Sequence, residues 1–74
     1  MKLEIEYTDT FGGEANYSWC RRREITLPDD ATDAQIKRAA KQALKLSGVR
    51  GKWEKMNDDL VFRPSGMHTI MFVC

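Results

Sequence analysis

The sequence predicts an α+β fold in which one helix packs on one face of an antiparallel sheet of four or five strands. Two observations lead to this prediction. Only residues 30–48 are long and periodic enough to form an amphipathic helix, and the other segments alternate like strands or carry turn residues. The 74 residues are expected to form one small domain, residues 1–74, with the element order ββαβββ.

The predicted helix covers about residues 32–47. Thr32 and Gln35 have the spacing of a capping box, and Gly48 is suited to the left-handed conformation that ends many helices. Four apolar residues recur at helical spacing and are expected to pack on the sheet: Ile36, Ala40, Ala43 and Leu44. The alanines in this stripe allow the helix to sit close to a flat partner.

A β-hairpin is predicted before the helix. Residues 2–8 alternate like a half-buried strand, residues 9–14 form a turn around Gly12 and Gly13, and residues 15–27 form the second strand. Arg21 and Arg23 interrupt the apolar face of that strand. Either a bulge around residues 20–23 shifts the register, or the strand presents arginine at its middle. The bulge is favoured because a buried, unpaired arginine is costly.

A three-stranded meander is predicted after the helix, with strands at about 52–56, 60–63 and 67–73. Both sides of the last strand are largely apolar, although one helix can cover only one side of the sheet. We therefore expect an exposed apolar surface that supports a homodimer or a tight partner complex, formed by Val61, Met71 and Val73, with Met56 beside them. The alternative is a monomer in which Lys2, Lys52 and Arg63 cover this surface.

The charge distribution is uneven. Lys and Arg number 12 against 11 Asp and Glu, and ten of the twelve basic residues fall between positions 20 and 55. This excludes an acidic nucleic-acid mimic and a uniformly basic protein. Two basic groups are candidate contacts to a nucleic acid or a partner protein: Arg21, Arg22 and Arg23 in the hairpin, and Lys37, Arg38, Lys41 and Lys45 on the helix.

Each basic group also has a structural interpretation. The hairpin arginines can pair with Glu4, Glu6 or Glu24 across the sheet while Tyr17 and Trp19 belong to the core. The helix lysines can form a solvated outer face.

The sequence contains no pattern typical of an enzyme, a cofactor site or a metal site. Cys20, Cys74 and His68 are too few for a structural zinc site, and His68 has no evident partner for general-base chemistry. Two free thiols are expected. No signal-peptide pattern and no membrane-spanning apolar run occur, so a cytoplasmic protein that does not contact membranes is expected.

The stretch from Thr8 to Trp19, TDTFGGEANYSW, continues into Cys20 and the three arginines. It resembles a stretch in short bacteriophage and prophage proteins that have no settled activity. The resemblance implies a non-enzymatic accessory protein that binds a host protein in the bacterial cytoplasm, a class that includes inhibitors of CRISPR–Cas and other defence systems. It implies no site residues. The alternative function is a small nucleic-acid-binding module that uses the two basic groups.

Overall fold

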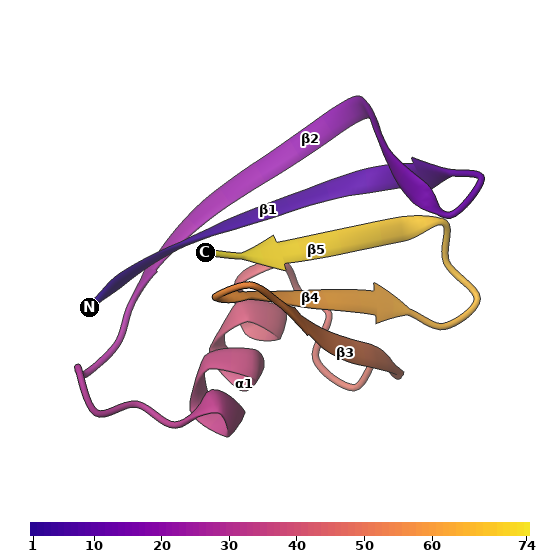
Figure 1. Cartoon of the computed structure of the whole chain (residues 1–74). Helices are drawn as coiled ribbons and strands as arrows, with labels where there is room; N and C mark the ends of the chain where they lie inside the picture. The colour runs from indigo at the N-terminus through magenta and orange to yellow at the C-terminus, as the bar shows by residue number, and fades with distance from the viewer.

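A computed structural model describes residues 1–74 and confirms the predicted α+β fold. Its elements are β1 (Lys2–Phe11), β2 (Glu14–Thr26), α1 (Asp33–Ala43), β3 (Gly51–Met56), β4 (Asp59–Pro64) and β5 (Thr69–Val73). The helix covers one face of the sheet, as Figure 1 shows. The observed order, ββαβββ, is the predicted one.

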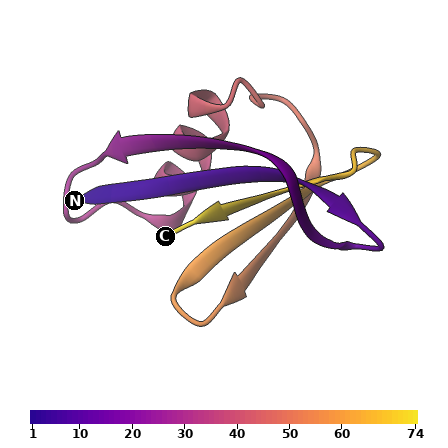
Figure 2. The same cartoon turned by 90° about the horizontal axis from the view of Figure 1, so that it is seen from above.

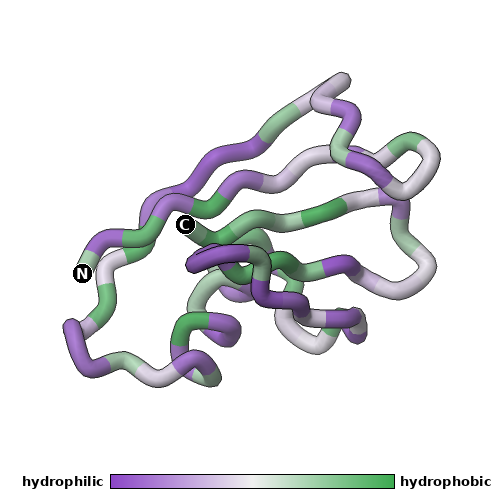
Figure 3. The backbone as a smooth tube through the Cα atoms, in the orientation of Figure 1, coloured by the Kyte–Doolittle hydropathy of each residue, from purple (hydrophilic) through white to green (hydrophobic).

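The five strands form one antiparallel sheet in the order β2-β1-β5-β4-β3. The two edge strands, β2 and β3, are consecutive in the chain, so the segment between them must cross the sheet. The helix makes this crossing and covers the core on its way (Figures 1 and 2). In Figure 3, the central strand β5 is largely hydrophobic, whereas the middle of the edge strand β2 is hydrophilic.

The start of α1 follows the sequence prediction. The Gln35 amide donates to the Thr32 hydroxyl at 3.2 Å, and the Thr32 amide donates to the Gln35 side chain at 2.9 Å, which completes the capping box. Ala40 is fully buried and Leu44 is buried beside it. Ile36 and Ala43 are partly buried against the same core. The predicted apolar stripe is therefore confirmed.

The helix ends earlier than predicted, at Ala43 rather than near residue 47. Lys45, with a φ of 58°, is the left-handed residue that ends the helix. Gly48 also adopts the expected left-handed conformation (φ 84°), but it lies in the loop beyond the helix end. The Lys45 amide donates to the Gln42 carbonyl at 3.1 Å, and the Leu46 amide donates to the Lys41 carbonyl at 2.7 Å, the two bonds of a Schellman motif. Burial of Leu46 in the core offsets the strain at Lys45 and reverses the chain here.

The third strand begins at a position that only glycine can occupy. A Cβ atom on Gly51 would lie 2.5 Å from the Arg63 carbonyl oxygen and 2.7 Å from the Phe62 ring. This close approach brings Trp53 opposite Phe62 in the β3–β4 ladder, and their ring centroids are 4.8 Å apart. The edge strand is thereby tied to the core through an aromatic pair.

The prediction for the two faces of β5 is wrong. Met71 pairs with Tyr7, and both face the helix, where Met71 and Val73 are 0 % and 3 % exposed within the main core cluster. The opposite face carries Ile70 and Val61 instead. Met71 and Val73 thus fill the space under the helix and form no surface.

Two apolar residues on the face without a helix, Val61 and Ile70, are also covered, whereas Phe72, which pairs with Val61, is partly exposed. Val61 and Ile70 are only 1 % and 2 % exposed. The hairpin bends over this face, because the Arg63 guanidinium of β4 donates to the Gly13 carbonyl in the hairpin turn at 2.9 Å. Figure 2 shows the strong twist of the hairpin at that end. The expected exposed surface of Val61, Met71 and Val73 is therefore absent from this chain.

Candidate functional site

The hairpin turn consists of two glycines. Phe11 pairs with Glu14, and the intervening Gly12 and Gly13 have φ values of 63° and 85°. A two-residue turn with positive φ at both positions matches the twist of the flanking strands, and glycine adopts it without steric cost. The tight Gly12–Gly13 turn is therefore confirmed, but the turn is shorter than the predicted residues 9–14, because β1 continues to Phe11 and β2 begins at Glu14. Phe11 thus lies at the tip of the hairpin.

The bulge in β2 lies at residues 16–19 and not at residues 20–23. Thr8 pairs with Cys20 and Thr10 pairs with Ala15, so β2 carries the extra residues between these two pairs. Tyr17 in the bulge has a φ of 56°. The predicted position is wrong because it assumed that an arginine at residues 21–23 would be buried. β2 is an edge strand in which these residues are exposed, so no shift in register is needed.

The Asp9 carboxylate holds the bulge in place. It accepts hydrogen bonds from the Asn16 amide group at 3.0 Å, from the Ser18 backbone amide at 3.0 Å and from the Ser18 hydroxyl at 2.5 Å. These donors, the Ser18 hydroxyl first, keep the pKa of Asp9 well below its ordinary range although the group is exposed. One carboxylate thus fixes the conformation of several otherwise irregular residues.

Thr8 supports the bulge from the sheet side. Its side chain is fully buried, and its hydroxyl donates to the Trp19 carbonyl at 2.7 Å and accepts from the Tyr17 amide at 3.1 Å. Interaction with the Glu6 carboxylate raises the pKa of the Tyr17 phenol. The Thr8 hydroxyl therefore anchors the bulge through two backbone groups, the Tyr17 amide and the Trp19 carbonyl.

The Asp9 clamp makes a testable prediction about pH. Because folding lowers the pKa of Asp9 below its ordinary 3.8, its stabilisation is present above that pH and is lost as the pH falls further. We expect Asp9→Asn to be less stable than the wild type at about pH 7, with the difference shrinking below about pH 4. Urea unfolding at several pH values measures this. The control is Asp30→Asn, at an exposed position, which should change stability little; an equal loss for both variants would contradict the clamp.

Three exposed aromatic side chains project from this part of the hairpin. Phe11, Tyr17 and Trp19 are 81 %, 53 % and 40 % exposed, and we call them the hairpin aromatics. Trp19 packs edge-on against Tyr7 with ring centroids 5.4 Å apart, and the Arg21 guanidinium lies 5.7 Å from its ring centroid. The two aromatics in β2 are not core residues, contrary to the structural interpretation of the sequence. Rigidly held aromatic and arginine side chains are typical of protein interfaces.

The three hairpin arginines point to different neighbours. Arg22 lies 3.5 Å from the Glu6 carboxylate, so for this residue the cross-strand pairing expected from the sequence is found. Arg23 donates to the backbone carbonyl of Arg22 at 2.8 Å. Arg21 lies over Trp19, as described above. The three arginines therefore make different contacts along the exposed edge strand and do not form a single cationic patch.

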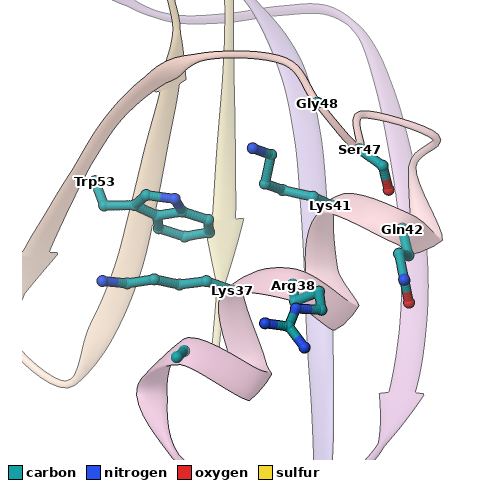
Figure 4. Close-up of a pocket in the computed structure, with 8 residues that line it drawn as sticks. Lys37, Arg38, Lys41, Gln42, Ser47, Gly48 and Trp53 are labelled. Atoms are coloured by element: carbon teal, nitrogen blue, oxygen red, sulfur yellow. The ribbon is translucent and has the colours of Figure 1, made fainter.

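The helix cations contribute to a second site. A groove of about 530 Å³ lies between α1, the following loop and β3. Its lining residues are Ala34, Lys37, Arg38, Lys41, Gln42, Ser47, Gly48 and Trp53. Figure 4 shows the lysines of α1 reaching toward the indole of β3. Lys45, the fourth predicted cation, is exposed beyond the helix end and does not line the groove.

Aromatic rings and a backbone carbonyl position the two groove lysines. The Lys41 ammonium donates to the Val49 carbonyl at 2.6 Å and lies 5.0 Å from the Phe62 ring centroid. The Lys37 ammonium lies 5.6 Å from the centroid of Trp53. The four ion pairs of the protein involve none of the groove cations. The groove therefore carries uncompensated positive charge beside an aromatic surface.

The remaining candidate residues are dispersed. His68 is exposed in the β4–β5 turn, and Cys20 and Cys74 are free and exposed. Although Cys74 is exposed as a residue, partial desolvation of its thiol, followed by the nearby Asp59 carboxylate, raises the pKa of that thiol. No three His, Cys, Asp or Glu side chains are grouped as metal ligands would be. No helix is long and apolar enough to cross a membrane.

Fold and surface define a small α+β domain with an aromatic hairpin at one end and a basic groove between α1 and β3. Comparisons with protein-family models, curated proteins and solved structures found no match. Sequence reasoning missed the exposure of Phe11, the role of Asp9 and the part of Trp53 in the groove. Phe11 beside the two turn glycines was a usable signal, because a residue flanking a tight turn cannot reach the core.

Proposed function

We propose that the protein is a non-enzymatic, phage-type accessory protein that binds a host protein through its hairpin. The observation that carries the proposal is the Asp9 clamp, which fixes the bulge that contains Tyr17 and Trp19. Phe11 is positioned separately by its pairing with Glu14 across the two-residue turn, and all three side chains are exposed. The resemblance of the stretch from Thr8 to Trp19 to phage proteins supports a host partner in the bacterial cytoplasm. Proteins of defence systems such as CRISPR–Cas are the first candidates.

Pre-organisation is the physical basis of this proposal. Binding is opposed by the entropy lost when loops and side chains become ordered, so a surface that is ordered beforehand binds more tightly. The clamp and the two-residue turn remove much of this cost before a partner arrives. Aromatic side chains have few rotatable bonds and large apolar area, so they dominate the energy of many interfaces.

The charge beside the hairpin aromatics favours a partner with an acidic rim. Arg21 and Arg23 form none of the ion pairs in the protein, and both are exposed on the edge strand next to Trp19. An arginine beside an exposed aromatic side chain, as Arg21 is beside Trp19, steers association with acidic surfaces and can add bidentate contacts to carboxylates. Binding is therefore expected to weaken with salt without being abolished by it.

Substitution in the hairpin tests the proposal. Burying a phenylalanine contributes about 1.5–3 kcal/mol, so we expect Phe11→Ala to weaken partner binding by at least roughly tenfold. Trp19→Ala should act in the same direction. Affinity capture from nuclease-treated bacterial lysate identifies the partner, and calorimetry with the purified partner then measures the variants.

Met56→Ala is the matched control, because Met56 is another exposed apolar residue, 50 % accessible, at the far end of the sheet. It should bind like the wild type. Equal binding by Phe11→Ala, Trp19→Ala and the wild type would reject the hairpin as the contact surface. Sedimentation of the purified protein tests self-association separately: a species at 8.5 kDa would exclude a homodimer.

A further inference from the structure

The groove between α1 and β3 has a chemistry that the proposed function does not use. Lys37, Arg38 and Lys41 line one wall, and Trp53 faces them from β3 (Figure 4). Like charges at positions 37 and 41 of one helix repel each other, and an anion in the groove would relieve that repulsion. The site thus combines an unneutralised cationic wall with an aromatic ring.

We propose that this groove binds a nucleotide unit, with its phosphate on the cationic wall and its base against the indole of Trp53. Phosphates pair with lysine and arginine, and bases stack on aromatic side chains in a sequence-tolerant way. The proposal is independent of partner binding through the hairpin.

Lys41 is prepared for the phosphate. An ammonium group has three donors, and Lys41 uses one on the Val49 carbonyl at 2.6 Å. That bond holds the ammonium at the groove, and two donors remain for a ligand. Arg38 adds a planar fork that matches two phosphate oxygens.

Lys37 and Trp53 act together at the other end of the groove. The Lys37 ammonium lies over the indole, which is half-buried and packed against Phe62. A base that stacks on the indole displaces this ammonium, which then pairs with the phosphate. Phe62 fixes the orientation of the indole, so the ring is a rigid platform for the base.

The groove is large enough for one nucleotide. Its volume of about 530 Å³ lies within the range of small-molecule sites, roughly 300–1,000 Å³. The Gln42 amide and the Ser47 hydroxyl line it and can contact sugar or base edges. A free mononucleotide and one unit of a single strand share this chemistry, whereas the stacked bases of a duplex cannot reach the indole.

The hairpin arginines are not part of this site. They lie on β2, whereas Trp53 lies on β3, and these strands form opposite edges of the sheet. The sequence suggested that both basic groups contact a nucleic acid. The site proposed here uses only Lys37, Arg38 and Lys41 of the helix group, because neither Lys45 nor the hairpin arginines line the groove.

Titration of the purified full chain tests the inference. The probes are inorganic phosphate, adenosine monophosphate, a labelled single-stranded decanucleotide and the corresponding duplex, each at low and moderate salt. We expect saturable binding of the mononucleotide or the single strand, with phosphate and duplex much weaker and an affinity that falls with salt. Equal affinity for mononucleotide and strand indicates a free nucleotide as ligand, and a much tighter strand indicates single-stranded nucleic acid; both support the site.

Variants assign the binding to the groove. Lys37→Gln should weaken nucleotide binding several-fold and lower the slope of log affinity against log salt concentration by about one. Trp53→Leu should weaken nucleotide binding about tenfold. Lys45→Gln removes a charge from the same helix outside the groove and should change nothing. The inference is overturned if neither nucleotide probe binds, if Lys45→Gln weakens binding as much as Lys37→Gln, or if substitution of Arg21 and Arg23 alone abolishes it.

Discussion

Ala40→Glu is expected to unfold the domain. Ala40 is 0 % exposed and packs between the helix and the sheet, within the cluster that contains Ile5 and Met71. A glutamate there would bury an unpaired carboxylate, which costs at least about 3 kcal/mol, and the added side chain would push the helix from the sheet. The whole domain should be stable by only about 4–11 kcal/mol.

Circular dichroism during heating measures this effect. Ala34→Glu is the control, because Ala34 is exposed in the first turn of the same helix, where a negative charge is favourable. It should melt like the wild type or slightly higher. An Ala40→Glu protein with an unchanged melting curve would contradict the packing of α1 on the sheet.

Phe62→Ala is expected to cost about 3–5 kcal/mol of stability. Phe62 is 1 % exposed, packs against Trp53 and lies under the Lys41 ammonium. Its loss would leave a cavity at the junction of the core and the groove. Phe62→Leu, which keeps most of the volume, should cost clearly less, and urea denaturation of both variants gives the comparison. A loss below about 1 kcal/mol for the alanine variant would contradict the observed burial.

Local sequence rules were sufficient for much of the fold. Thr32 and Gln35 specify the helix start because a capping box is formed by residues three apart, with no help from the rest of the chain. Gly12 and Gly13 specify the hairpin in the same way. These elements, and the ββαβββ order of the elements along the chain, follow from short-range chemistry, so the sequence was enough to predict them. The order of the strands within the sheet depends on the long-range pairing of β1 with β5 and was not predicted.

The errors all concern long-range contacts. The helix end depends on burial of Leu46, which draws the chain into the core before Gly48 is reached. Which face of β5 meets the helix depends on its register with β1, and two apolar faces contain no signal to choose between them. Val61 is covered because the hairpin bends over it and accepts a hydrogen bond from the Arg63 guanidinium at the Gly13 carbonyl. No local sequence pattern encodes this contact.

The sequence was equally incomplete for the two sites. Helical spacing was enough to group Lys37, Arg38 and Lys41. Trp53 joins them only because α1 crosses the sheet and comes to lie beside β3. Asp9 resembled an ordinary turn residue. Its role becomes visible only when the bulge brings Asn16 and Ser18 back to its carboxylate.

Site-specific photo-crosslinking in bacterial cells tests the hairpin proposal most directly. A photoreactive phenylalanine replaces Phe11 in one variant and Met56 in another, since both side chains are exposed at opposite ends of the sheet. We expect one dominant crosslinked host protein from position 11, none from position 56, and loss of that product when Trp19→Ala is added. Equal crosslinking from both positions, or a product from position 56 alone, would contradict the hairpin as the binding surface.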